Sequence, residues 1–457
     1  MFNMKITISP PPPPIEVDVN VFYEHWNHRY WEQSGEVFLS LSEANVQRRL
    51  LDLGFSSSRK HGASEVDKML MRLQRENKVD YVGQIGGWPL GCYTYGNKKL
   101  LVTAQTPLLK TTYGGSTVIQ DFRKQLYGGA QAVVKHAWTK LAIEARREGE
   151  RRIKAGFSPA WPIQQTICIV GAKNHGKTLD AQIDLLAIGG PAAKAVNPTQ
   201  SHNGDTSFNE DLSEEVVHLM DDEGGRDDYA ARRRFGEEIK KSVATIGKRV
   251  HGKGKKAITL DPFTRTIILL NDKLEDTRVL PPMDKGMGDK FILLKTVGSG
   301  VNHNDGRTFQ SRRDHYLSAV SDYLGWLETW EIPDWLKDPE NRYGVKSYHN
   351  QDVLDSLAEL SNETQLVHLI IKFSDLDGTT KTSGEVYSRL LEDRLCTTSR
   401  RTETLTIAKN AIVFGKIMAA AADRFPKILI PVGRSNGSAM RYKIVFPKPA
   451  TEEVELA

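Results

Sequence analysis

The chain has 457 residues, which is too long for one ordinary hydrophobic core and predicts two or three domains. Hydrophobic residues make up 39% and charged residues 26%, and no window offers the roughly 18 apolar residues that a membrane span needs. We therefore expect a soluble, globular, intracellular protein without a membrane partner. The net charge of +5 is too modest to identify a nucleic-acid-binding protein. Three widely separated cysteines, Cys92, Cys168 and Cys396, favour reduced thiols over a disulfide or zinc framework.

The N-terminal third is predicted to be a small α/β module. Residues 22–53 read as aromatic and helical, and Gly54 ends the second helical pattern. Ser64 is the expected cap of a helix at 64–74, and a strand follows at 100–103. Residues 118–153 read as two helices, of which the second has a strongly basic end.

Two features of this module have a structural and a functional interpretation. Its early aromatic residues, among them Trp26, are more often core residues than stacking platforms for nucleic-acid bases. The basic end of the second helix includes Arg146 and Arg147, and solvated helix surface is its expected role.

Residues 171–178 fit the phosphate-binding loop G-x-x-x-x-G-K-[ST]. They follow an apolar strand at 166–170 and precede a segment with helical spacing. Such a loop directs backbone N–H groups at nucleotide phosphates, while a lysine reaches the terminal phosphates and a hydroxyl binds magnesium. We expect ATP and Mg²⁺ here, and chance occurrence of the string is the alternative. The predicted cofactor-binding residues are Gly171, Ala172, Lys173, Asn174, His175, Gly176, Lys177 and Thr178.

Two later strands supply the remaining catalytic candidates. An apolar strand at 216–220 runs into Asp221, Asp222 and Glu223. We assign Asp222 to magnesium, together with Thr178, and Glu223 to the attacking water, and a shift of register by one residue stays open. A third strand, 265–270, ends in Asn271. Some ring ATPases have an extra strand between the strand that precedes the phosphate-binding loop and the strand that ends in the acidic residues, and an asparagine at the tip of this extra strand holds the lytic water. The alternative for each acidic or amide residue is an ordinary polar turn.

A basic segment lies between these two strands. Residues 249–251 and 257–260 flank a glycine-bearing turn, which is typical of a hairpin with cations at its tip. Lysine and arginine contacts to phosphates give affinity for single-stranded DNA without sequence choice. A solvated charge run is the alternative. The predicted DNA-binding residues are Lys248, Arg249, His251, Lys253, Lys255 and Lys256.

In combination, these motifs resemble the superfamily 3 helicases in the form found in phage and plasmid primase-helicase proteins. The resemblance covers most of the chain and is strongest from Gly171 to Lys295. Besides the segments above, it is carried by Thr206-Ser207-Phe208-Asn209, Phe235-Gly236, Leu260 with Pro262, Leu269-Leu270-Asn271-Asp272 and Leu280-Pro281-Pro282-Met283-Asp284. The resemblance implies an AAA+-like ATPase that assembles as a hexamer, with hairpins lining a central channel and 3′-to-5′ movement on single-stranded DNA.

One departure concerns the basic residue that reaches the neighbouring subunit's γ-phosphate. The family commonly offers an arginine after the third strand, whereas this chain has Asp289-Lys290. Lys290 takes that role in our assignment, with Arg278 or Lys285 as substitutes. An arginine fits a spread transition-state charge better than a lysine.

The expected fold class is α/β, with an AAA+-like P-loop NTPase core, an N-terminal α/β or helical collar module and a C-terminal helical, winged-helix-like region. Helices at 384–392 and 408–421, followed by a strand pair at 428–432 and 442–446, suit a winged helix. The expected domains are a collar, oligomerisation or DNA-binding module at 1–156, the ATPase at 157–300, a helical extension at 301–375 and the winged-helix-like domain at 376–457.

The expected function is an ATP-dependent DNA helicase, and hence an ATP hydrolase, in the replication of a phage or mobile element. It would act on single-stranded or forked DNA in the cytoplasm of a host cell. No primase site is visible before Trp161, so a separate primase or polymerase is the expected partner. The alternative is an origin-binding initiator or primase loader that uses ATP to assemble on DNA and unwinds little.

Overall fold

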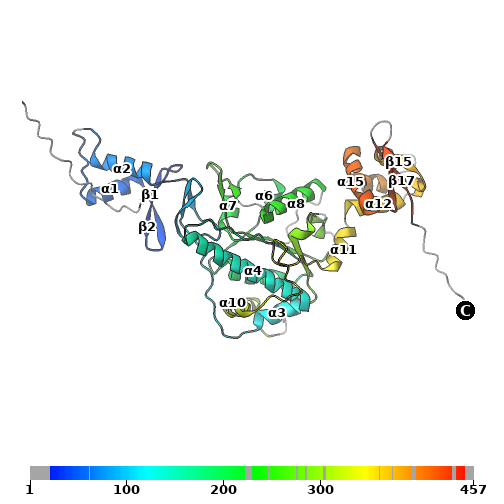
Figure 1. Cartoon of the computed structure of the whole chain (residues 1–457), viewed down its shortest axis with the longest axis horizontal. Coiled ribbons are helices and arrows are strands. Elements are labelled where there is room, and N and C mark those ends of the chain that lie inside the picture. The colour runs from blue at the N-terminus through cyan, green and yellow to red at the C-terminus, as the bar shows by residue number, and fades with distance from the viewer. Residues whose placement is uncertain are drawn as a thin grey trace, which may run out of the picture.

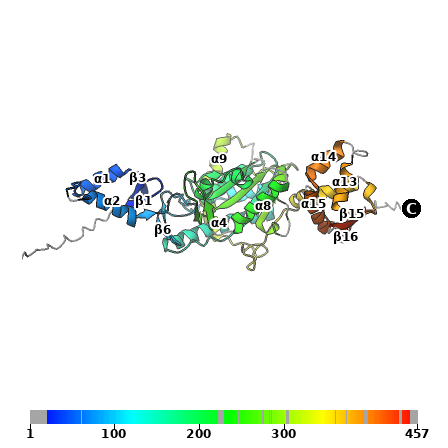
Figure 2. The same ribbon diagram turned by 90° about the horizontal axis from the view of Figure 1, so that it is seen from above.

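The chain folds into three units arranged in a row, as two perpendicular views show (Figures 1 and 2). The N-terminal unit and the C-terminal unit lie at opposite ends of a larger central body. The computed structural model describes residues 21–447 except 61, 222–228, 245–246, 274–275, 282, 284–285, 302–304, 360, 373, 393–397 and 435–438.

The N-terminal unit begins with three strands and not with helices. Alternate residues, such as Val21, Tyr23 and Tyr30, are buried against two helices, which is the period of a half-buried sheet. The helical prediction for 22–41 is therefore wrong, whereas Gly54 does follow a helix and Ser64 does cap one. The elements are β1 (Val21–Glu24), β2 (Arg29–Ser34), β3 (Val37–Leu41), α1 (Glu43–Asp52), α2 (Glu65–Glu76) and β4 (Lys78–Val79), with sheet order β3-β2-β1-β4.

A second small sheet joins this unit to the central body. It consists of β5 (Tyr81–Gly83), β6 (Gly91–Tyr95) and β7 (Lys98–Val102), in the order β5-β7-β6. Its buried face packs against a hairpin of the central body, formed by β11 (Lys248–Val250) and β12 (Ile258–Leu260). The indole N–H groups of Trp88 and Trp161 both donate to the carbonyl of Asp261, each at 2.8 Å.

The central body is built on a parallel sheet of five strands in the order β14-β8-β13-β10-β9. The side chains of β8 and β13 are buried throughout, as expected when helices cover both faces of a parallel sheet. The predicted third strand, β13, pairs with β8 on one side and β10 on the other. The strands are β8 (Thr166–Val170), β9 (Ala195–Val196), β10 (Val217–Asp221), β13 (Arg265–Leu270) and β14 (Phe291–Lys295).

The hydrophobic core around this sheet includes helices that precede β8 in the sequence and helices that follow β14. The two helices at 118–154 pack into this core, so they belong to the central body and not to an N-terminal module that ends at 156. The helices are α3 (Val118–Tyr127), α4 (Gly129–Lys154), α5 (Lys177–Asp184), α6 (Thr199–Asn203), α7 (Glu210–Glu214), α8 (Tyr229–Ala244), α9 (Phe309–Ser318), α10 (Val320–Thr329) and α11 (Gln351–Glu359).

Arg146 on α4 differs from the surface role that the sequence predicts for it. Only 1% of the residue is exposed, and its guanidinium donates to the carbonyls of Ile188 and Thr106 and to the Glu150 carboxylate. Because these three acceptors satisfy the buried cation, Arg146 ties α4 to the segment after α5 and to the loop at Thr106.

A cluster of four charged side chains lies buried beneath α5. Arg123 of α3 donates to Asp180 at 2.7 Å and to Asp184 at 2.6 Å, and Lys135 of α4 pairs with the same two carboxylates. All four side chains are 0% exposed. The hydroxyl of Tyr323 on α10 lies 2.6 Å from Arg123, which brings a fourth helix into the cluster.

The C-terminal unit has a hydrophobic core of its own. Leu366, Val367, Leu369 and Ile370 belong to that core, so the unit begins before the expected boundary at 376. The predicted strand pair is present as β16 and β17, with β17 beginning two residues earlier than expected. The elements are α12 (Asn362–Lys372), β15 (Thr380–Thr382), α13 (Ser383–Leu391), α14 (Thr398–Ile407), α15 (Ala411–Arg424), β16 (Leu429–Arg434) and β17 (Met440–Ile444), with sheet order β15-β17-β16.

Among the residues that the structure describes, no single helix is long and apolar enough to cross a membrane. One pair of helices, Arg400–Ile407 with Ala411–Arg424, passes by length and composition only and is bent by 80°.

Candidate functional site

The loop at 171–178 connects the end of β8 to the start of α5. Gly176 has φ +107° and Asn174 has φ +64°, so the chain turns through left-handed backbone before the helix begins. A Cβ at Gly171 would collide with Thr296, which follows β14. Thr296 also holds the loop from behind, because its hydroxyl lies 2.8 Å from His175 Nδ1. Gly176 is therefore required by the backbone geometry of the loop. Gly171 is required by packing against Thr296.

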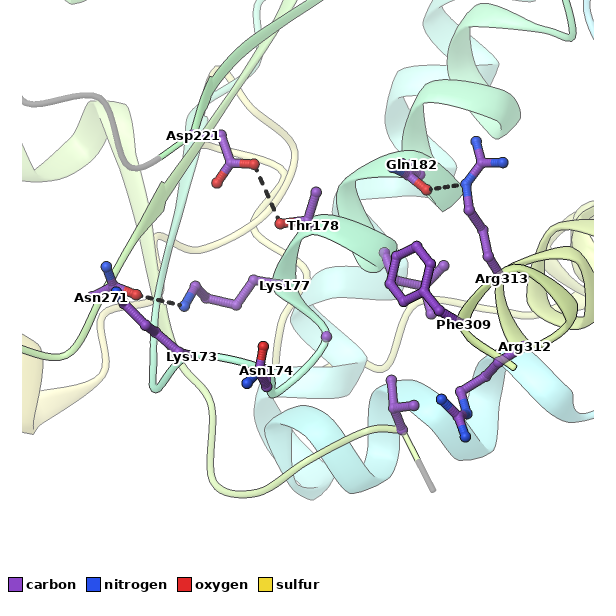
Figure 3. A pocket seen from close by; sticks show the side chains of 13 residues that line it. Lys173, Asn174, Lys177, Thr178, Gln182, Asp221, Asn271, Phe309, Arg312 and Arg313 are labelled. Atoms are coloured by element: carbon purple, nitrogen blue, oxygen red, sulfur yellow. Dashed lines mark hydrogen bonds between the residues drawn. The ribbon is translucent and has the colours of Figure 1, made fainter. Parts of the chain in front are cut away.

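Lys177 begins α5 and turns its ammonium back toward the loop. Nζ lies 2.5 Å from the Gly171 carbonyl, 3.1 Å from the Ala172 carbonyl and 3.3 Å from Asn271 Oδ1 (Figure 3). Asn271 directly follows β13 and is 8% exposed. The structure thus brings together Lys177 and Asn271, two residues that the sequence assigns to one site from motifs 94 positions apart.

A carboxylate from β10 completes the group. Thr178 Oγ1 lies 3.3 Å from Asp221 Oδ2, and Asp221 is the last residue of its strand (Figure 3). The sequence assignment gives the metal to Asp222 and the water to Glu223, which lie outside the described residues. The assignment of the metal to Asp222 stays a prediction, and among the described residues the carboxylate beside Thr178 is Asp221. The signal that points to it is the end of the apolar run at Met220.

These residues line one cavity of about 510 Å³, within the range of small-molecule sites. Helix α9 closes its other side, and Arg313 Nε donates to Gln182 of α5 at 2.8 Å. Phe309, at the start of α9, is 79% exposed and lines the same cavity. Sequence reasoning missed α9, because nothing in its pattern shows that it folds back onto the loop. The cavity is lined by Lys173, Asn174, Gly176, Lys177, Thr178, Leu179, Gln182, Asp221, Asn271, Val301, Phe309, Arg312 and Arg313.

The donor atoms in this cavity suit a magnesium–nucleotide complex. Thr178 and Asp221 offer a hydroxyl and a carboxylate oxygen, which are the ligand types that Mg²⁺ takes alongside water and phosphate oxygens. Within the described part of the chain, no group of three or more His, Cys, Asp or Glu residues is arranged to hold a metal ion alone.

Lys290 lies apart from the residues that line this cavity. Its ammonium pairs with Asp289 at 2.7 Å, and only 12% of its side chain is exposed. Asp289 is also held by Arg342 at 2.5 Å. In this conformation Lys290 does not present its charge to a neighbouring molecule. Of the two substitutes, Lys285 lies outside the described residues, as does the side chain of Arg278.

The predicted basic hairpin is present, and it divides its cations into two groups. Lys248 turns inward to the Thr264 hydroxyl, and burial lowers the pKa of Lys248 to about 8. Lys255 pairs with Glu210 at 2.6 Å, and the His251 ring lies 5.1 Å from the Phe208 ring. Arg249, Lys253 and Lys256 are exposed. The inward position of Lys248 favours a structural role over the nucleic-acid contact that the sequence suggests.

The fold resembles that of two solved structures. The apo structure of the C-terminal region (305–718) of NrS-1 matches with a TM-score of 0.52 and 12% sequence identity, covering 93% of this chain and 96% of that one. The A form of the apo structure of the same region gives a TM-score of 0.51 and 11% identity, with coverage of 93% and 96%. At these identities the likeness concerns the fold. No protein-family model matches this chain, and no curated protein matches it.

Proposed function

We propose that the protein is an ATP hydrolase coupled to DNA, of the superfamily 3 helicase type. One observation carries the proposal: Lys177, Thr178, Asp221 and Asn271 converge on a single cavity from the ends of three adjacent parallel strands. In open parallel sheets, ligands bind in the crevice beyond the carboxyl ends of the strands. The α/β fold that this chain shares with the C-terminal region of NrS-1 is consistent with the proposal.

Each residue has a distinct role in the proposed hydrolysis. The Lys177 ammonium, which now contacts two loop carbonyls, would exchange them for phosphate oxygens of ATP. Thr178 and Asp221 would hold Mg²⁺, which supplies positive charge for the phosphate oxygens when bound. Asn271 lies within reach of Lys177 and would orient the terminal phosphate and the attacking water. Glu223 remains our candidate for activating that water.

Phe309 has a proposed role at the opposite side of the cavity. Its ring is exposed, whereas the phosphate-binding loop lies across the cavity from α9. The Arg313–Gln182 hydrogen bond joins α9 to α5, the helix that begins in the loop, and so keeps the start of α9 beside the cavity. We propose that the ring stacks on the adenine base, because an exposed aromatic face is a suitable partner for a base.

The proposed coupling to DNA rests on where the hairpin lies in the chain. The β11–β12 hairpin lies between β10 and β13 in the sequence. Strand β10 ends in Asp221, and β13 ends directly before Asn271. The hairpin's exposed cations, Arg249, Lys253 and Lys256, would contact the phosphates of a single strand. A homo-hexamer that moves 3′ to 5′, with Lys290 of one subunit serving the next, stays part of this proposal, although Lys290 would first have to leave Asp289.

The second candidate function is an origin-binding initiator or primase loader. The observation that favours it is the C-terminal unit, in which a helix, a strand and three helices precede an antiparallel strand pair, the order of a winged helix with one helix added. Arg434, Arg441 and Lys443 are exposed on that strand pair. Such a unit would bind duplex DNA through phosphates and a groove-facing helix.

Strand displacement on tailed duplexes separates the two functions. We expect ATP-dependent displacement from a duplex with a 3′ single-stranded tail and none from a duplex with a 5′ tail. Lys177→Ala serves as the control and should remove both hydrolysis and displacement. Binding of the duplex without displacement, in a protein that hydrolyses ATP, would favour the loader. Absence of ATP binding by the unmodified protein would exclude both.

A further inference from the structure

The turn between β1 and β2 presents an exposed aromatic surface on the N-terminal unit. Residues 25–29 are all exposed, and Trp26 is 49% exposed. The His25 ring lies between its neighbours, with its centroid 5.5 Å from the Trp26 ring and 6.0 Å from the His28 ring. An aromatic group in a turn is therefore solvent-accessible here and does not belong to the core that the sequence predicts for it.

This turn is held in one conformation by its own hydrogen bonds. The buried Glu24 carboxylate accepts from Asn27 Nδ2 at 2.5 Å and from Trp31 Nε1 at 2.9 Å. His28 has φ +50°, an uncommon value for a residue other than glycine, and its Nδ1 lies 2.9 Å from the Tyr23 hydroxyl. Because these hydrogen bonds hold the backbone of the turn that carries Trp26, ordering the turn on binding should cost little entropy.

The basic hairpin of the central body meets this turn. Trp26 and Lys256 line the same crevice, together with Gly252 and Lys255 at the hairpin tip. The crevice also holds three carboxylates. Glu210 is neutralised by Lys255, whereas Glu24 and Asp80 keep their charge and accept hydrogen bonds from neutral donors, so the positive charge lies at the exposed lysines of the hairpin tip. In Figure 1, α7, which carries Glu210, lies at the side of the central body nearest the N-terminal unit. Segments some 230 positions apart along the chain therefore form one surface.

We infer that Trp26 and the exposed lysines 253 and 256 form one binding site for single-stranded DNA, in which a base stacks on Trp26 while the lysines contact the backbone. Proteins that bind single strands without sequence preference combine aromatic platforms with a cationic groove. The proposal rests on the proposed DNA coupling of the hairpin and extends it, since the N-terminal unit would contribute directly to the strand's path and not only to assembly.

The two parts of the site differ in their response to salt, and this difference provides the test. The full chain is titrated into a fluorescent oligothymidylate over a series of salt concentrations, with anisotropy as the readout. Trp26→Ala should weaken binding roughly 5- to 150-fold, the range of one lost base stack, and leave the slope of log affinity against log salt unchanged. Lys253→Ala combined with Lys256→Ala should instead lower that slope.

Two further variants separate stacking from packing. Trp26→Phe keeps an aromatic face and should retain most of the affinity. Trp335→Ala, which removes an indole of similar exposure (48%), should leave DNA binding unchanged. If Trp26→Ala binds as tightly as the unmodified protein, the stacking role of Trp26 is wrong, while the proposed DNA coupling still stands. The same conclusion follows if Trp26→Phe binds as weakly as Trp26→Ala and both variants unfold at a lower temperature. Failure of the unmodified protein to bind any single strand would overturn the DNA coupling as well.

Discussion

Asp221 is the carboxylate that lines the cavity beside Thr178, and it directly precedes Asp222 in the sequence. Asp221 lies 3.3 Å from Thr178 Oγ1, so removal of its charge should remove a magnesium ligand. We expect Asp221→Asn to lower the rate of ATP hydrolysis by about 100-fold or more, the scale for losing one group that stabilises transition-state charge. Phosphate release measured against Mg²⁺ concentration checks this. Asp334→Asn, at a 97% exposed carboxylate, is the matched control. Full activity of Asp221→Asn would return the metal to Asp222.

Phe309 gives a second prediction at the scale of one side chain. If its ring stacks on adenine, Phe309→Ala should weaken ATP binding by about 1–3 kcal/mol while leaving binding of inorganic tripolyphosphate unchanged. Calorimetric titration with both ligands tests this, and Phe157→Ala, which removes a ring of 63% exposure, is the control. Equal losses for both ligands would mean that Phe309 supports the cavity without contacting a base.

The residue scale also shows how far sequence reasoning reaches. The loop at 171–178 and Asn271 were predictable, because backbone requirements and strand ends leave marks in the order of residue types. The choice between Asp221 and Asp222 depended on where β10 stops, which a run of apolar residues fixes only within one position. Phe309 was not predictable, because an exposed aromatic residue acquires its neighbours from tertiary structure alone.

Among single elements, α5 depends on the buried charge cluster beneath it. Burial would raise the pKa of Asp180, but Arg123 and Lys135 outweigh this and hold the pKa at about 2, below the ordinary 3.8. A carboxyl with a depressed folded-state pKa contributes stability above its unfolded pKa and loses it as the pH falls. The free energy of unfolding should therefore decrease from about pH 4 toward pH 2. Chemical denaturation at several pH values measures it, and Asp180→Asn should remove this part of the dependence.

Removal of one cation from the cluster should be costly. Arg123→Ala leaves two buried carboxylates with one cation between them, and we expect a loss of about 3–5 kcal/mol in the free energy of unfolding. Arg72→Ala, which breaks the exposed ion pair with Glu76 on α2, should cost about 1 kcal/mol or less. Equal effects of the two variants would show that the cluster contributes nothing beyond surface charge.

The β11–β12 hairpin predicts different outcomes for lysines only a few positions apart. Lys253 and Lys256 are exposed, so replacing both with alanine should weaken single-strand binding and leave basal hydrolysis largely intact. Lys248 points inward, so Lys248→Ala should lower thermal stability and leave the salt dependence of binding unchanged. Anisotropy and thermal unfolding on both variants distinguish these effects. DNA binding that is unchanged in the double variant would contradict the placement of DNA on the hairpin.

Helices and strands were predictable where the spacing of hydrophobic residues and the length of the segment indicated the same type of element. The strands of the central sheet and the hairpin were found, because each is an apolar or β-branched run bounded by turn residues. The strands at 21–41 were read as helices, because their aromatic residues occur at spacings that fit either period. Arg146 was placed on the surface, since the carbonyls that accept its hydrogen bonds come from segments about 40 positions away.

For the whole molecule, separate cores predict separate unfolding. The C-terminal unit buries its own cluster, including Phe414 and Ile417, apart from the core of the central body. We expect differential scanning calorimetry to resolve more than one transition, and Mg-ATP to raise only that of the central body, by about 2.7 kcal/mol in stability at 100 times Kd. Lys177→Ala should abolish the shift. A single transition that moves as a whole would mean that the units unfold together.

The position of β13 between β8 and β10 has a mechanical consequence. The hairpin's second strand ends at Leu260, and after a short segment anchored by both tryptophan indoles at Asp261 the chain enters β13. That strand spans about 20 Å and ends beside Asn271. Because β13 is hydrogen-bonded to a strand on each side, we expect a displacement at one of its ends to be passed on to the other. A force on the hairpin would therefore reach the Asn271 amide, which contacts Lys177. In this way β13 would link the hairpin mechanically to the cavity.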